Sequence, residues 1–229
     1  MLKNLMYDLR SIKERDPAAR NMFEIFMLYS GFHALIYHRV ANALYRGRLF
    51  FLARWVSQLG KFFTGIEIHP AAKIGRGLFI DHGTGVVIGE TAEVGDNVTI
   101  YQGVTLGGTG KDVGKRHPTI GNDVLVGTGA KILGPFKVGD GARIAANAVV
   151  LEEVPENATA VGIPAKVVRV GGERVQQFDH MSIPDPIAQE ISQIYGELSR
   201  LRGIIEASGI GSQGIASTPI NDENDASIE

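Results

Sequence analysis

The stretch that decides the fold is IGNDVLVGTGAKILGPFKVGDGARIAANAVV, residues 120–150. An aliphatic residue recurs in it every six positions, at Ile120, Val126, Ile132, Val138, Ile144 and Val150. In most of these units a small or apolar residue, such as Val124 or Ala130, follows four positions later. A period of six fits neither an α-helix nor an ordinary alternating strand. It is typical of a parallel β-helix, in which each unit forms one flat side and three units close a triangular coil.

The same register extends upstream, through Ile68, Ile74, Ile80, Ile88, Val94, Ile100 and Leu106. Two insertions break it, one of two residues near Val86 and one of eight between Gly107 and Thr119. The thirteen units predict about four coils at about 4.8 Å each, a prism roughly 20 Å tall. The chain holds 29 glycines, and we expect those in the repeat to permit the corners. Examples are Gly75, Gly89, Gly95, Gly121, Gly127 and Gly139.

Helices are expected on both sides of the repeat, which makes the fold class α+β. Leu2, Leu5, Leu9 and Ile12 recur at helical spacing, and Asp16-Pro17 predicts a helix start, with an N-cap followed by proline. Polar, glycine-rich sequence closes the chain and predicts disorder. The expected parts are a helical domain (1–65), a β-helix (66–170), a linker with a C-terminal helix (171–208) and a disordered tail (209–229).

The C-terminal helix is predicted from a heptad seam between Ile187 and Ile205, where apolar residues alternate in steps of four and three. Mixed isoleucine and leucine at the core positions favour three or more strands. Two hypotheses stay open: a three-helix bundle beside a trimeric prism, or a helix that packs back on its own chain.

Composition excludes several classes of protein. The 23 basic and 25 acidic residues give a net charge near −2, which does not suit a general nucleic-acid binder. Cysteine is absent, so the chain has no disulfide, zinc-thiolate site or cysteine nucleophile. The most apolar stretch, 49–65, is too short and too charged to cross a membrane, and the N-terminus lacks a signal segment. We therefore expect a cytoplasmic protein without membrane or nucleic-acid partners.

Two sites along the repeat carry candidate chemistry. His82 follows Asp81 beside the first insertion, and Glu67 shares that corner about one coil lower, where a carboxylate could orient the imidazole of a general base. The second insertion is a glycine-rich, basic excursion that ends in Arg116-His117, which could bind a carboxylate. It leaves the prism one corner away from His82, so it could meet the His82 of a neighbouring chain, which is the hypothesis of a site between subunits. A solvated His82 and a plain surface loop are the structural alternatives.

Several motifs together carry a specific resemblance. They are DPAAR (16–20), GFHAL (31–35), FIDHGTGVVIGETA (79–92), GVTLGGTGK (103–111) and KRHP (115–118). With the six-residue repeat, they resemble serine O-acetyltransferases of the hexapeptide-repeat acyltransferase superfamily over about residues 1–170. The resemblance implies a helical N-terminal region before a left-handed parallel β-helix. It also implies acetyl transfer from acetyl-CoA to the hydroxyl of L-serine, the first step of cysteine biosynthesis.

The resemblance assigns roles to individual residues. His82 matches the catalytic base, and Glu67 stands where the family usually has aspartate as its partner. Asp16 matches a contact to the amino group of serine, Asp81 another substrate contact, and Arg116 and His117 the residues that grip the carboxylate end. Four positions resemble the CoA groove: Gly108, Thr128, Ala146 and Lys166. Acetyl-CoA is implied as co-substrate, with no metal.

The resemblance also implies partners. L-cysteine is expected as a feedback inhibitor at the serine site, and the short helical region favours a homotrimer over the hexamers of longer relatives. The family docks a terminal isoleucine into O-acetylserine sulfhydrylase, whereas this sequence places Glu229 after Ile228. A charged residue in an apolar pocket carries a desolvation cost, so we expect a weak complex or none.

Three other functions are alternatives to serine acetylation. Another acetyltransferase of the superfamily, acting on a sugar or an aminoglycoside, fits the fold, but Asp16 and Arg116 suit a zwitterionic amino acid better. A γ-type carbonic anhydrase needs three zinc-binding histidines, and the spacings of His69, His82 and His117 do not match its pattern. A non-enzymatic scaffold is the third.

Overall fold

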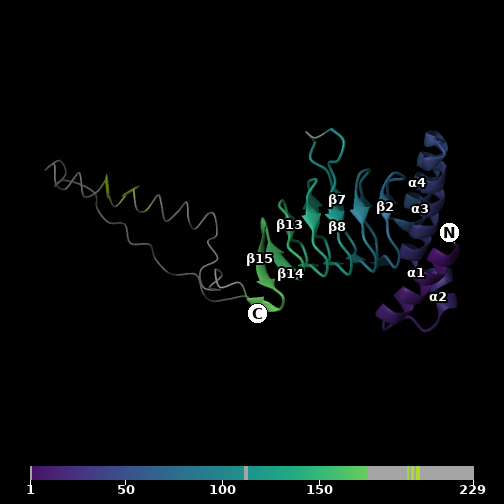
Figure 1. The fold of residues 1–229 in the computed structure, drawn as a ribbon, viewed down its shortest axis with the longest axis horizontal. Helices are drawn as coiled ribbons and strands as arrows, with labels where there is room; N and C mark the ends of the chain where they lie inside the picture. Colours follow the sequence, from purple (N-terminus) through teal and green to yellow (C-terminus); the bar gives the residue numbers. More distant parts are fainter. Residues whose placement is uncertain (1, 111–112, 175–194, 196, 199, 202–229) are drawn as a thin grey trace, which may run out of the picture. The chain divides into compact units, whose positions relative to one another are not determined.

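The computed structural model describes residues 2–110 and 113–174, together with 195, 197, 198, 200 and 201. The chain divides into two compact units, Met1–Phe178 and Asp179–Glu229. Four helices open the first unit and a stack of short strands follows them (Figure 1). The helices are α1 (Leu2–Arg15), α2 (Met22–Leu28), α3 (Ser30–Arg46) and α4 (Phe50–Thr64). No helix among the described residues is long and apolar enough to cross a membrane.

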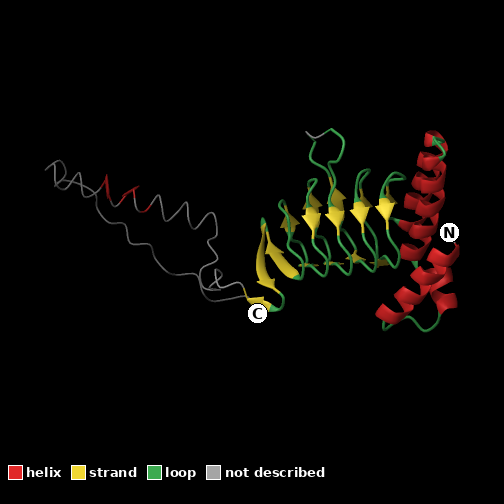
Figure 2. Ribbon diagram, viewed as in Figure 1, coloured by secondary structure: helices red, strands yellow, loops and turns green. Residues whose placement is uncertain are grey.

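The strands form a parallel β-helix, as the repeat predicts (Figure 2). Side A consists of β1 (Glu67–Ile68), β4 (Val87–Ile88), β7 (Thr105–Gly107), β10 (Lys131–Leu133) and β13 (Val149–Val150). Side B consists of β2 (Lys73–Ile74), β5 (Glu93–Val94), β8 (Thr119–Ile120) and β11 (Lys137–Val138). Side C consists of β3 (Phe79–Asp81), β6 (Thr99–Tyr101), β9 (Leu125–Val126), β12 (Arg143–Ile144) and β14 (Ala158–Gly162). Each of the thirteen repeat units therefore supplies one strand, β1 to β13.

The core is a set of aliphatic columns that run along the inside of the prism. On side A, parallel pairing stacks Ile68, Ile88, Leu106, Ile132 and Val150. The other four members of this column are fully buried or nearly so, because each coil covers the one before it. Between 66 and 174, sides A and C each have five parallel strands rather than four, because the thirteenth repeat unit adds β13 to side A and β14 continues side C beyond the last repeat unit.

The glycines named from the repeat have a different function from the predicted one. Gly75 and Gly127 do not adopt left-handed backbone angles. They are needed because a Cβ atom at Gly75 would lie 2.5 Å from the carbonyl oxygen of Gly95, and one at Gly127 would lie 2.7 Å from the backbone nitrogen of Ala146. The left-handed corner positions are occupied by other residues, among them Gly77, Asn97, Gly103, Asp123, Gly129, Gly141 and Asn147.

The predicted helix start at Asp16-Pro17 is wrong. The backbone N–H of Asp16 donates to Ile12 at 2.9 Å and so closes α1, and the Asp16 side chain turns the chain by accepting from the N–H of Ala18 at 2.8 Å. The N-cap of the next helix is Asn21, whose side chain accepts from the backbone N–H of Glu24. An Asx turn and an N-cap use the same side-chain acceptor, which is why the sequence alone does not separate them.

Polar contacts fix the helices on the first coil. The fully buried carboxylate of Asp8 accepts from the N–H of Gly77 at 2.7 Å and from Arg39 at 2.7 Å. Gly31 at the start of α3 lies so near the β-helix that a Cβ atom there would be 2.2 Å from the carbonyl oxygen of Ile80. This close approach explains the glycine of the GFHAL motif.

Beyond the last coil the chain folds back as β15 (Ala165–Val170) and β16 (Glu173–Arg174), antiparallel to the strands before them. Most of the predicted heptad helix lies outside the described residues. Its described members, Tyr195, Glu197, Leu198, Arg200 and Leu201, are helical. The trimeric bundle and the tail, 209–229, stay predictions.

Candidate active site

Most of the predicted site residues lie on or beside two different corners of the β-helix, whereas Asp16 follows α1 and Lys166 lies in β15. The corner from side C to side A, here the CA corner, carries His82, Thr128 and Ala146. The corner from side A to side B, the AB corner, carries Gly108 and the excursion 108–118. Within one chain, His82 is thus one corner away from Arg116 and His117, as the sequence predicts.

His82 projects from the CA corner. Its backbone is left-handed, with φ of 58°, and its side chain is 76% exposed. The nearest carboxylate oxygen recorded for its Nε2 atom belongs to Asp81, at 4.0 Å. An exposed imidazole with no closer carboxylate among the described residues can meet a substrate, and these residues do not enclose it.

Glu67 is the first residue of β1 on side A, so it lies beside the predicted corner, and it pairs with Val87 in the next coil. Its carboxylate is bound by two cations of α4, Lys61 at 2.6 Å and Arg54 at 3.4 Å. The hydrogen bond from Lys61 lowers the pKa of Glu67, aided by the charge of Arg54, so the carboxylate stays ionised. The pairing of Glu67 with His82 stays a prediction. To pair with His82, Glu67 must leave Lys61 and Arg54 or share its carboxylate with them.

Asp16 contacts one tyrosine that the sequence analysis did not single out. The hydroxyl of Tyr29 donates to Oδ2 of Asp16 at 2.6 Å, and the charges of Asp16, Glu24 and Asp81 act on it. Tyr29 is the residue just before the helix that carries the GFHAL motif, and its aromatic ring gave no signal to distinguish it from a core residue.

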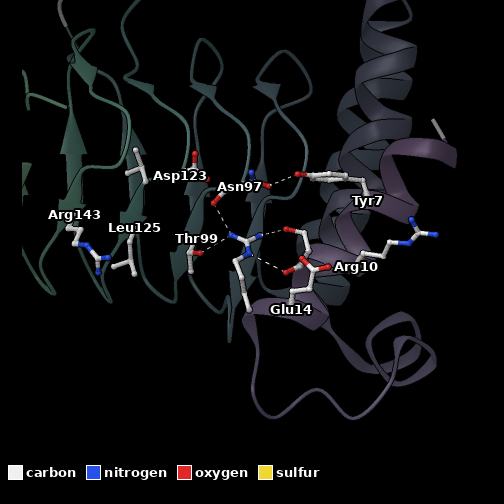
Figure 3. Close-up of a pocket in the computed structure, with 11 residues that line it drawn as sticks. Tyr7, Arg10, Glu14, Asn97, Thr99, Asp123, Leu125 and Arg143 are labelled. Carbon is white, nitrogen blue, oxygen red and sulfur yellow. Dashed lines mark hydrogen bonds between the residues drawn. The ribbon is translucent and has the colours of Figure 1, made fainter. Parts of the chain in front are cut away.

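Arg15 positions Asp16, because its hydrogen bonds attach the end of α1 to the coils of the β-helix. Its guanidinium donates to the carbonyl of Asn97 at 2.8 Å, to the hydroxyl of Thr99 at 3.0 Å and to the carbonyl of Gly77. Figure 3 shows Tyr7 of the same helix directed at Asn97, and their side chains are 3.0 Å apart. The cavity of about 520 Å³ in this view contains none of the predicted site residues, which lie on open corners.

On the AB corner, Thr91 organises the end of the excursion. Its Oγ1 atom accepts from the backbone N–H groups of Arg116 and His117, at 3.0 and 3.1 Å. The Nδ1 atom of His117 accepts from the backbone N–H of Thr91 at 3.2 Å, so the neutral ring carries its proton on Nε2. Burial, aided by the charge of Arg116, lowers the pKa of His117. His117 is therefore suited to donate a hydrogen bond as a neutral imidazole.

Arg116 is paired with Glu90, whose Oε2 atom lies 2.5 Å from one guanidinium nitrogen. Both side chains are about one-third exposed, and the guanidinium has further N–H groups for a carboxylate. Gly108 packs directly against this group, because a Cβ atom there would lie 2.9 Å from Cγ of Arg116. The AB corner thus presents two hydrogen-bond donors suited to an anionic group.

The four positions that resemble a CoA groove are divided between the corners. Thr128 and Ala146 follow His82 up the CA corner, where the backbone N–H of Asn147 donates to the carbonyl of Thr128. Lys166 lies in β15 and pairs with Glu152 at 3.1 Å, while Gly108 is on the AB corner. A groove that uses all four requires the CA corner of one chain to face the AB corner of another.

The three histidines weighed for zinc do not gather. His69 and His117 lie on the AB corner, where the charge of His117 acts on His69, and His82 lies on the CA corner. Within the described ranges, no three side chains of histidine, cysteine, aspartate or glutamate are grouped to hold a metal.

Comparisons with known proteins agree on one family. The profile "Serine acetyltransferase, N-terminal" matches residues 1–36, and "Bacterial transferase hexapeptide (six repeats)" matches residues 117–152. A serine acetyltransferase of Bacillus pumilus is 54% identical over 202 residues, which cover 88% of this chain and 93% of that protein.

Two solved structures carry informative ligands. The Brucella abortus serine acetyltransferase in complex with coenzyme A is 46% identical, with a TM-score of 0.72, over 74% of this chain and 68% of that one. The Neisseria gonorrhoeae serine acetyltransferase in complex with serine is 44% identical, with a TM-score of 0.71, over 73% and 69% of the two chains.

Proposed function

Because the chain belongs to the serine acetyltransferase family, we propose that it transfers the acetyl group of acetyl-CoA to the hydroxyl of L-serine, giving O-acetyl-L-serine and CoA. The observation that carries this function is the exposed imidazole of His82 with the carboxylate of Asp81 4.0 Å from its Nε2 atom. A carboxylate next to an exposed base suits a substrate with an ammonium group beside its hydroxyl.

His82 acts as the general base in this proposal. The serine hydroxyl is a weak nucleophile, so the imidazole takes its proton as the oxygen attacks the thioester carbonyl. The carbon–sulfur bond then breaks, and the imidazolium returns the proton to the CoA thiolate. Glu67 is proposed to stabilise the imidazolium, and the two cations that hold it keep its charge available. A backbone N–H of the Gly107-Gly108 turn is proposed to stabilise the tetrahedral oxyanion.

The remaining groups position the substrates. Arg116 and the Nε2 proton of His117 are proposed to hold the serine carboxylate, and Asp16 and Asp81 its ammonium group. CoA is proposed to extend along the CA corner past Thr128 and Ala146 toward Lys166. The stacked coils give this arm a straight path with one backbone step about every 4.8 Å.

The two corners make a complete site only between chains, so we propose a homotrimer with one site at each interface. Mixing His82→Ala chains with Arg116→Ala chains tests it. Each variant alone is expected to be inactive, and mixed trimers are expected to recover activity at interfaces that combine one intact corner from each chain. If subunit exchange is verified and activity does not recover, the site is formed by two corners of the same chain.

A panel assay tests the reaction itself. Thiol release from acetyl-CoA is measured with L-serine, a galactoside and an aminoglycoside as acceptors, for the wild type and for His82→Ala. We expect release with serine only, reduced by several orders of magnitude in the variant. Release with the sugar and not with serine would support the alternative acceptor. A role in cysteine biosynthesis, inhibition by L-cysteine and a cytoplasmic location follow from the same proposal. A complex with O-acetylserine sulfhydrylase concerns residues outside the described part and stays an expectation.

A further inference from the structure

Tyr29 is held rigidly at the junction of two helices. Its backbone N–H donates to the carbonyl of Ile25 at 3.2 Å and ends α2, and its own carbonyl accepts from His33 at 3.1 Å and begins α3. The ring packs against the small apolar cluster that includes Phe32 and Phe79. Backbone and ring are both fixed, so the hydroxyl has a defined position in the absence of substrate.

The hydroxyl lies within an acidic environment. It donates to Oδ2 of Asp16 at 2.6 Å, a short, charge-assisted hydrogen bond. The other oxygen of Asp16 already accepts from the N–H of Ala18, so both carboxylate oxygens are held. Two further negative charges act on the same phenol, that of Glu24 in α2 and that of Asp81, which lies at the end of β3 next to His82.

The phenol is suited to hydrogen bonding and unsuited to proton transfer. Partial burial and the hydrogen bond to Asp16 raise the pKa of Tyr29 to about 12. The hydroxyl therefore keeps its proton at working pH and uses it in the hydrogen bond to Asp16. A phenol that donates still has lone pairs, which can accept a hydrogen bond from a third group.

We propose that Tyr29 is a specificity-determining residue of the serine site: its oxygen and the carboxylates of Asp16 and Asp81 form three acceptors for the three N–H bonds of the substrate ammonium group. This inference rests on the proposed function and names a residue that the function does not assign. Two carboxylates alone attract any cation, whereas a rigid third acceptor matches the geometry of a primary ammonium. Tyr29 also orients Asp16 before the substrate arrives.

Steady-state kinetics of Tyr29→Phe test the proposal. The variant keeps the ring and its packing and removes one hydroxyl. A hydrogen bond to a charged group contributes about 1.5–3 kcal/mol, so KM for L-serine should rise about tenfold or more, with kcat changed less than threefold. The matched control is Tyr37→Phe within α3, where the ring stacks on Phe63 of α4 with centroids 6.4 Å apart. Its KM should match that of the wild type.

A substrate analogue separates a role in ammonium binding from a structural one. 3-Hydroxypropanoate has the hydroxyl and carboxylate of serine and lacks the amino group. Its inhibition constant should be the same in wild type and Tyr29→Phe. An inhibition constant that rises in parallel with KM for serine would overturn the proposal, because it would show general damage to the site. KM and the inhibition constant do not depend on the concentration of active enzyme, so a smaller folded fraction of the variant does not change them.

A double-variant cycle with Asp16→Asn distinguishes failure of this inference from failure of the proposed site. If Asp16→Asn leaves KM for serine unchanged, the assignment of Asp16 in the proposed function is wrong. If Asp16→Asn raises KM and Tyr29→Phe does not, the inference about Tyr29 alone is wrong. If the proposal is right, each single variant raises KM for serine. Adding Tyr29→Phe to Asp16→Asn should then raise KM by a smaller factor than Tyr29→Phe does in the wild type, because the two groups act together.

Discussion

Gly89 controls the position of His117 and offers a sharp test of the AB corner. It follows β4, and its backbone N–H donates to the carbonyl of Leu106 at 3.1 Å. A Cβ atom at this position would lie 2.0 Å from both Cδ2 and Nε2 of the His117 ring. The backbone of Gly89 is not left-handed, so alanine meets no conformational strain and acts through this contact alone.

The size of the effect follows from the overlap. Carbon atoms in contact stand about 3.5 Å apart or more, so Gly89→Ala must push the ring by roughly 1.5 Å. A displacement of about 1 Å at a positioned group can reduce the rate about 100-fold. We therefore expect kcat/KM for L-serine to fall by about two orders of magnitude, or about 2.7 kcal/mol of transition-state stabilisation. The moved ring also loses its hydrogen bonds to Thr91.

The assay is thiol release from acetyl-CoA at varied serine, with melting temperature measured on the same samples. Gly110→Ala is the matched control, because no heavy atom lies within 4 Å of a Cβ atom at Gly110. It should keep wild-type kinetics. If Gly89→Ala retains kcat/KM within threefold, His117 either tolerates the displacement or does not contact the substrate, and the argument for the AB corner is refuted.

Three further outcomes are expected. Asp8→Ala should reduce the free energy of unfolding by about 3–5 kcal/mol, because it removes the buried carboxylate that neutralises Arg39 and accepts from the N–H of Gly77; urea denaturation measures it, with Glu14→Ala on the exposed face of α1 as control. Burial lowers the pKa of His38 from 6.5 to about 3, so the unfolded chain binds a proton below pH 6.5 that the folded chain does not. Stability should therefore fall by about 2 kcal/mol from this group between pH 7 and pH 5, and His38→Phe should lose that part of the slope; equal slopes would reject it. L-Cysteine should compete with L-serine, and Asp16→Ala should weaken both; inhibition independent of serine concentration would contradict a shared site.

The sequence by itself determined the β-helix. Its six-residue period repeats one local requirement, an aliphatic residue that packs on its equivalent in the next coil, and the thirteen repetitions leave one arrangement that buries them all. For the same reason the sequence placed His82 and the excursion on adjacent corners, since counting residues along a regular coil gives the corner. The two insertions coincide with the CA corner that carries His82 and the AB corner that carries the excursion, because extra residues leave the regular path of the coil.

Only the tertiary structure decided which side chains pair. The cations that hold Glu67 come from α4, and Tyr29 meets Asp16 because α1 and α3 lie together on the first coil. Helix packing follows from side-chain shape over distant segments, and no period in the sequence records it. The glycines illustrate the same limit: the repeat located Gly75 and Gly127, but the approach of the next coil, not a left-handed corner, is the physical reason they are glycine.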